Sequence, residues 1–390
     1  MKIIKENDKK YVANTYARFD LEITRGKGSL VYDTNGKEYI DLNSGIATNT
    51  FGVSDDVWCE AVTKQLSLVQ HTSNLYYSEP CSTLAKLLSE KTGAKKVFFA
   101  NSGAEANECA IKVARKWAKE NKGDGYHTII TLKNSCHGRT ITTLAATGQD
   151  SFHTVFDPFT EGFVYANAND SEGLCALVEN TNCCAIMFEP VQGEGGVIAL
   201  DKEFVNTIAK IAKEKNLLII VDEVQTGNGR CGTLYAYEQY GINPDIVTTA
   251  KGLGGGLPIG AALLFERCEN TLTPGTHGST FGGNPIASAG AISVVERLTP
   301  EFLSEVREKA QLIRDTLIGA PGIKSVSGLG LMVGIETEKD ASEIISYCMA
   351  NGVLPIKAKN KIRLLPALNI PKNQLIRALE VIKAGAVKEG

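Results

Sequence analysis

The chain of 390 residues has little net charge and no long apolar run. Its 41 basic and 44 acidic side chains leave a net charge of −3, without the basic excess typical of nucleic-acid-binding proteins. No apolar stretch approaches the roughly 20 residues that a membrane-spanning helix needs, and residues 1–16 lack the apolar centre of a signal peptide. We therefore expect a cytoplasmic protein with no nucleic-acid partner and no membrane partner.

Paired metal ligands are also missing. The ten cysteines show no Cys-x-x-Cys spacing, and the five histidines show no His-x-x-x-His pair. Scattered cysteines in a chain of this length are typical of reduced, mostly buried thiols in the cytosol. We expect no metal site.

Internal repeats and Pro/Ser-rich linkers are absent, although 390 residues exceed one ordinary hydrophobic core. Residues 30–42 have the pattern of two strands joined by an Asp-Thr-Asn-Gly turn. From about residue 80, apolar runs alternate with amphipathic segments, which is typical of a mainly parallel α/β sheet. The expected strands are 97–100, 127–132, 185–188, 217–221, 246–249 and 260–265. We predict a large α/β domain (56–290) and a smaller α+β domain built from both chain ends (1–55 and 291–390).

Polar segments follow three of these apolar runs, at the strand ends where ligands bind in such sheets. The first is Asn-Ser-Gly-Ala-Glu (101–105), which opens a helix. Free N–H groups and the helix dipole at this start favour a phosphate. The alternative is a plain helix cap made by Ser102 or Asn101.

The other two strand ends carry an acid and an amine. Asp222 follows an apolar strand, where a carboxylate needs a partner and is able to keep a cofactor ring nitrogen protonated. Lys251 precedes Gly-Leu-Gly-Gly-Gly, and partial desolvation there would lower its pKa and favour Schiff-base formation. A solvated loop acid and a solvated surface lysine are the alternatives. Together, a phosphate site, an acid and an amine at one sheet edge meet the demands of pyridoxal 5′-phosphate (PLP).

Seven segments resemble the class III (ornithine-type) aminotransferases, in order and across nearly the whole chain: NSGAEANECAIKVARKW, CHGRT, FEPVQGEGG, VDEVQTGNGR, TTAKGLGGGLPIGA, HGSTFGGNP and IRLLPAL. Residues 25–52 are similar to the acetylornithine-type members of that family. The resemblance implies a fold-type-I PLP transferase that acts as a homodimer with composite active sites. It further implies transfer of the δ-amino group of N²-acetylornithine to 2-oxoglutarate, giving glutamate, by ping-pong chemistry in arginine biosynthesis.

The resemblance also implies roles at the cofactor. Lys251 would form the Schiff base and then move the proton, while Asp222 would pair with the pyridine nitrogen. Val224 would pack on one ring face, and Gln225 would contact the ring hydroxyl. The phosphate would be held by the backbone of Ser102, Gly103 and Ala104 and by Thr280 of the neighbouring subunit.

Substrate contacts are implied as well. Arg139 would hold the donor carboxylate, and Arg363 would bind the α-carboxylate of glutamate or 2-oxoglutarate, because arginine binds carboxylates bidentately. A surface ion pair is the alternative for either arginine. Glu189 would pair with Arg363 when the donor is bound, and Tyr16 would touch the donor carboxylate. One departure from the family is Cys136, at a position where a ring-stacking aromatic residue is usual.

Ile46 lies where the family varies with substrate, and it offers no hydroxyl to a free α-ammonium. This favours an acylated donor over ornithine, with succinylornithine, acyl-lysine and 4-aminobutyrate as further alternatives. A nucleotide-dependent oxidoreductase is disfavoured because no GxGxxG sits in a first strand-to-helix turn. A catalytically silent PLP-fold binding protein is disfavoured because Lys251 and Asp222 are both present.

Overall fold

A computed structural model describes residues 2–387 of the chain. Seven strands form the main sheet in the order β4-β12-β11-β10-β7-β5-β6. In chain order they are β4 Lys96–Ala100, β5 Thr128–Leu132, β6 Phe163–Ala166, β7 Cys183–Phe188, β10 Leu218–Asp222, β11 Ile246–Thr249 and β12 Gly260–Leu264. Strand β12 runs in the opposite direction to the other six. The predicted α/β fold with a mainly parallel sheet is confirmed.

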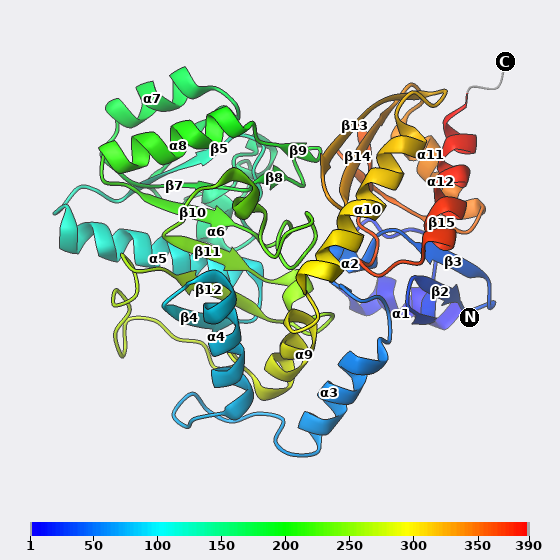
Figure 1. Cartoon of the computed structure of the whole chain (residues 1–390), viewed down its shortest axis with the longest axis horizontal. Coiled ribbons are helices and arrows are strands. Elements are labelled where there is room, and N and C mark those ends of the chain that lie inside the picture. The colour runs from blue at the N-terminus through cyan, green and yellow to red at the C-terminus, as the bar shows by residue number, and fades with distance from the viewer. Residues whose placement is uncertain (1, 388–390) are drawn as a thin grey trace.

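Helices cover both faces of this sheet (Figure 1). Helix α5 (Gly103–Asn121) packs on one face, and α8 (Lys202–Glu214) packs on the other. Strand β10 serves both layers, because Leu218 and Ile220 join the core under α5 while Ile219 and Val221 join the core under α8. Residues that alternate between two buried faces explain why the strand is apolar throughout.

Two four-stranded sheets lie beside the main sheet, with strand orders β1-β2-β3-β15 and β13-β14-β17-β16. Their strands are β1 Ile23–Lys27, β2 Leu30–Asp33, β3 Glu38–Asp41, β13 Ile323–Leu329, β14 Met332–Thr337, β15 Val353–Leu354, β16 Ile356–Ala358 and β17 Lys361–Leu364. Strands β2 and β3 form the expected antiparallel hairpin, and β3 pairs with β15 from the other chain end. Both chain ends thus share one sheet, whereas the predicted domain boundaries stay predictions.

The remaining helices complete these layers: α1 Lys2–Tyr11, α2 Ser44–Ala47, α3 Asp56–Leu66, α4 Glu79–Thr92, α6 Ile141–Ala146, α7 Ser171–Glu179, α9 Pro285–Val295, α10 Pro300–Leu317, α11 Ala341–Ala350 and α12 Lys372–Ala386. Helices α3 and α4 both pack against α9. None of the helices within residues 2–387 has the length and apolar character needed to span a membrane.

Candidate active site

A cavity of about 550 Å³ opens where β4, β10 and β11 end. Ten of the predicted site residues line it: Ser102, Gly103, Ala104, Cys136, Arg139, Glu189, Asp222, Val224, Gln225 and Lys251. Arg363 contacts two of the cavity residues from β17. Tyr16 and Thr280 are not among the lining residues. The sheet therefore brings the predicted amine, acid and helix start together.

The start of α5 forms one wall of the cavity. Ser102 is the N-cap, and its Oγ accepts a hydrogen bond from the backbone N–H of Glu105 at 3.2 Å. The backbone N–H groups of Gly103 and Ala104 in the same first turn have no carbonyl partner within the helix, and such groups bind anions. A Cβ on Gly103 would lie 2.6 Å from Cγ1 of Val224, so only glycine lets Val224 approach this turn. Ser102 therefore caps α5 without excluding a phosphate at the start of the same helix.

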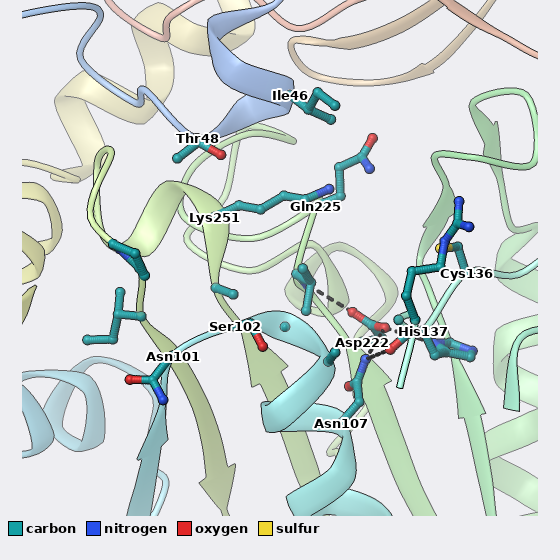
Figure 2. A pocket seen from close by; sticks show the side chains of 18 of the residues that line it. Ile46, Thr48, Asn101, Ser102, Asn107, Cys136, His137, Asp222, Gln225 and Lys251 are labelled. Carbon is teal, nitrogen blue, oxygen red and sulfur yellow. Dashed lines mark hydrogen bonds and ion pairs between the residues drawn. The ribbon is translucent and has the colours of Figure 1, made fainter. Parts of the chain in front are cut away.

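Asp222 ends β10 with 3% of its surface exposed, and three hydrogen bonds hold it. Its Oδ2 accepts from Asn107 Nδ2 at 2.8 Å and from His137 Nδ1 at 2.7 Å, and its Oδ1 accepts from the N–H of Val224 at 3.0 Å (Figure 2). Burial lowers the pKa of His137, but the hydrogen bond and charge of Asp222 outweigh burial and raise it. Asp222 is thus a buried, paired acid, not a solvated one.

Lys251 follows β11 and extends across the cavity toward Gln225 (Figure 2). Burial lowers the pKa of its amine, and the charge of Glu194 opposes this effect only in part. Its φ of 42° lies in the left-handed region, which costs a residue with a side chain about 1–2 kcal/mol. Such strain persists where the surrounding structure enforces it, often at functional sites. Lys251 is therefore a partly desolvated amine on a strained backbone.

Arg363 is 3% exposed and pairs with a glutamate that the sequence did not single out. Its Nη1 donates to Glu194 Oε1 at 2.7 Å and to Gln225 Oε1 at 3.2 Å. Burial would raise the pKa of Glu194, but the charge of Arg363 outweighs it, and the pKa is lowered. Glu194 lies in the same FEPVQGEGG motif as Glu189, and this second acidic residue was the available signal.

Glu189 has a different partner in this structure. Its Oε1 accepts the backbone N–H of Cys136 at 2.8 Å, and burial raises the pKa of its carboxyl to about 8. An arginine brought beside this carboxyl would lower its pKa and favour the charged form. The pairing of Glu189 with Arg363 was expected for the donor-bound protein, and it stays a prediction.

Three predicted residues lie toward solvent. Arg139 is exposed at the cavity, with its guanidinium 4.0 Å from the ring centroid of Phe152. Tyr16 is 68% exposed and lines a separate hollow formed by residues 4–23. Thr280 is exposed, although the neighbouring Ser279 Oγ accepts a hydrogen bond from Asn101 of the cavity wall at 3.3 Å.

The family model for class-III aminotransferases matches residues 11–385. The chain belongs to this family. An acetylornithine aminotransferase of Haemophilus ducreyi is 50% identical over 381 residues, which cover 97% of each chain. A succinylornithine transaminase of Citrobacter koseri is 41% identical over 402 residues, 99% of each chain. The structure of ornithine aminotransferase from Toxoplasma gondii matches with a TM-score of 0.94 at 32% identity, covering 99% of this chain and 94% of that one.

Class-III aminotransferases use PLP, so this protein is a PLP-dependent aminotransferase of fold type I. The residues of the cavity fit that cofactor. The start of α5, whose first backbone N–H groups have no carbonyl partner within the helix, suits the phosphate, and a buried carboxylate with three donors suits a protonated ring nitrogen. A desolvated lysine suits an aldehyde carbon.

Cys136 leads to a prediction about cofactor retention. It is partly buried at the cavity, and burial raises the pKa of its thiol to about 12, so the thiol is a weak nucleophile. Cys136→Phe is expected to leave the enzyme active and slow PLP release about threefold to tenfold, because an aromatic ring adds stacking on the cofactor. PLP release is measured by absorbance after dilution of the loaded protein. Cys136→Ala is the matched control, and unchanged or faster release from Cys136→Phe would contradict the prediction.

Proposed function

We propose that the enzyme transfers the δ-amino group of N²-acetylornithine to 2-oxoglutarate, giving the acetylated glutamate semialdehyde and glutamate in arginine biosynthesis. The observation that carries the proposal is the placement of two arginines at different depths. Arg363 is buried and already paired with Glu194, whereas Arg139 is exposed at the same cavity. The carboxylate of the donor therefore binds Arg139, and the terminal amine of the donor extends into the cavity toward Lys251.

The second substrate uses the other arginine. 2-Oxoglutarate has two carboxylates, and its α-carboxylate replaces Glu194 at Arg363. The guanidinium has a free donor for this carboxylate, because Arg363 Nε has no hydrogen-bond partner among the described residues. In this structure Glu194 occupies Arg363, and the keto acid would displace it. The predicted pairing of Glu189 with Arg363 in the donor-bound enzyme remains part of the proposal.

When bound, PLP supplies an electron sink for the carbon that carries the amine. Lys251 would hold the cofactor through its amine, and the same amine, when free, would carry the proton. Asp222 would keep the ring nitrogen protonated, Val224 would pack on the ring, and Gln225 would contact the ring hydroxyl. The backbone of Ser102, Gly103 and Ala104 would bind the phosphate.

The acylated end of the donor faces an apolar side chain. Ile46 lines the cavity on a turn, residues 44–47, whose four φ values of 47°, 66°, 58° and 63° are all left-handed. Asn43 Oδ1 accepts the N–H of Ile46 at 2.8 Å and helps to hold this strained turn. Ile46 offers no partner to a free α-ammonium, which supports an acylated donor. Acetyl and succinyl groups differ too little for this contact alone to separate them.

We propose further that two copies form a homodimer with composite sites in the cytoplasm. Supporting this is a set of large, exposed side chains that a partner would cover: Leu75, Tyr76, Tyr77 and Phe281. Asn74 Nδ2 donates to the carbonyls of Ser279 and Gly282 at 3.0 Å, so Thr280 lies within the same surface. Thr280 would reach the phosphate of the partner from there, and Tyr16 keeps its predicted role at the donor carboxylate.

The test is an absorption spectrum of the PLP-loaded protein with a donor and no keto acid. We expect N²-acetylornithine to remove the violet band of the bound cofactor, and 2-oxoglutarate to restore it. A band that persists with acetylornithine but is lost with succinylornithine, ornithine or 4-aminobutyrate would keep the reaction and change the donor. A protein that shows no violet band after PLP is supplied would refute the role of Lys251.

A further inference from the structure

Asn107 is a polar residue in the buried interior of α5. It is 1% exposed and lies among the buried residues Ala106, Cys109 and Ala110. Asparagine is a poorer helix former than alanine, and a buried amide is unfavourable unless it is hydrogen-bonded. The amide at this position therefore needs a reason beyond helix formation.

The side chain of Asn107 joins three segments that surround the cavity. Its Nδ2 donates to Asp222 Oδ2 and to the carbonyl of His137, both at 2.8 Å. Its Oδ1 accepts from Thr248 Oγ1 on β11 at 2.6 Å. Both ends of the amide are satisfied, which agrees with its burial.

The orientation of this amide is determined by its neighbours. Asp222 Oδ2 and the carbonyl of His137 are both acceptors, so the end of the amide that faces them must be the NH₂ group. The hydroxyl of Thr248 then supplies the proton for Oδ1. A flipped amide would place its oxygen against two other oxygens, so Asp222 and the carbonyl of His137 allow one orientation.

The hydrogen bonds distinguish the two oxygens of Asp222. Oδ2 accepts from both Asn107 and His137, which uses its two acceptor positions. Oδ1 accepts only the N–H of Val224 among the described residues, and one of its positions stays open. The carboxylate thus has a single oxygen available to a ring nitrogen in the cavity.

Thr248 ties this arrangement to the strand that carries the lysine. In the parallel pairing of β10 and β11, Thr248 is the partner of Asp222. Lys251 follows Thr248 by three residues in the chain. The amide of Asn107 therefore spans the acid and the strand of the amine, the two groups that approach opposite ends of the cofactor ring.

We propose that Asn107 is a positioning residue for the cofactor. Its amide, oriented by the acceptors Asp222 and the carbonyl of His137 and held by the hydroxyl of Thr248, occupies Oδ2 of Asp222 so that Oδ1 alone is presented to the ring nitrogen of PLP. The proposal rests on the role proposed above for Asp222. It predicts that loss of the amide loosens PLP and weakens ring protonation, even though Asn107 lies outside the set of predicted cofactor contacts.

The experiment uses PLP-loaded Asn107→Leu and Thr248→Val, with PLP release and the pH midpoint of the violet band as readouts. A hydrogen bond to a charged group has a larger effect than a neutral one, so we expect PLP release to accelerate about tenfold or more in Asn107→Leu and about fivefold in Thr248→Val. We expect both midpoints to move to higher pH, because a less protonated ring withdraws fewer electrons from the nitrogen of Lys251. Thr248→Val keeps the test decisive if Asn107→Leu does not fold.

Two control variants separate positioning from stability. Thr248→Ser keeps the hydroxyl and is expected to behave as the wild type in both readouts. Thr249→Val removes the next hydroxyl on β11, which accepts a hydrogen bond from Asn228 Nδ2. Asn228 Nδ2 also donates to the carbonyl of Ala250 at 3.3 Å, and this hydrogen bond remains in the variant. Thr249→Val is therefore expected to lower only the thermal midpoint of unfolding.

The outcomes are distinguishable. Unchanged release and an unchanged pH midpoint in Asn107→Leu and Thr248→Val, with only lower thermal stability, would show a purely structural role and overturn the proposal. If Asp222→Ala retains PLP as well as the wild type with the same pH midpoint, the role of Asp222 fails, and the proposal fails with it.

Discussion

Lys251→Ala is expected to reduce aminotransferase activity by at least about 10⁴-fold, because it removes both the covalent attachment and the group that moves the proton. Burial lowers the pKa of Lys251 below its ordinary value of 10.5, which increases the share of neutral amine available to PLP. The measurement is the protein mass after borohydride treatment of the PLP-loaded enzyme. The wild type should gain the mass of the cofactor on the peptide that contains Lys251, and the variant should gain none.

The matched control for this prediction is Lys324→Ala, which removes an exposed lysine on β13. It should keep both the activity and the mass gain of the wild type. The role of Lys251 in PLP attachment would be contradicted if the Lys251→Ala variant retained substantial activity. It would also be contradicted if the variant gained the mass of the cofactor on the same peptide. The thermal midpoint of the cofactor-free variant provides a check that the fold is intact.

The main sheet could be predicted from the sequence because its central strands are buried on both faces. In β10, successive residues enter the cores under α5 and α8, so the strand is one continuous apolar run. Strand β6 was not predicted, although residues 163–166 are a short apolar run; it lies at the sheet edge, and only its last residue is buried. The exact domain boundaries depend on contacts between distant segments, and no local pattern reports these.

The candidate site shows the same division between local and tertiary information. Lys251 and Asp222 could be singled out because each follows a buried strand, and the ends of such strands meet at one edge. The contacts of Asn107 could not, because its partners lie 30, 115 and 141 residues away in the chain. Glu194 was missed for a similar reason, since its pairing with Arg363 spans 169 residues.

Asp222→Ala is expected to lower kcat about 10³-fold, which makes it the second largest effect. Without the carboxylate, nothing compensates the positive charge of a protonated ring nitrogen in this buried site, so the electron sink is weakened. The loss also frees His137, whose pKa should fall because the hydrogen bond and charge of Asp222 no longer oppose burial. Steady-state kinetics with the donor and 2-oxoglutarate measure the effect.

A cofactor with a permanent charge tests the physical cause. PLP methylated at the ring nitrogen carries its positive charge without any help from a carboxylate, and removal of the Asp222 side chain makes room for the methyl group. Loading Asp222→Ala with this analogue should restore a large part of the lost activity, whereas the wild type should gain none from it. If the analogue fails to improve the variant while it binds normally, Asp222 does not act by protonating the ring. The hydrogen bonds from Asn107 and His137 would then hold it for another purpose, because three donors on one buried carboxylate stabilise its charged form whatever it faces.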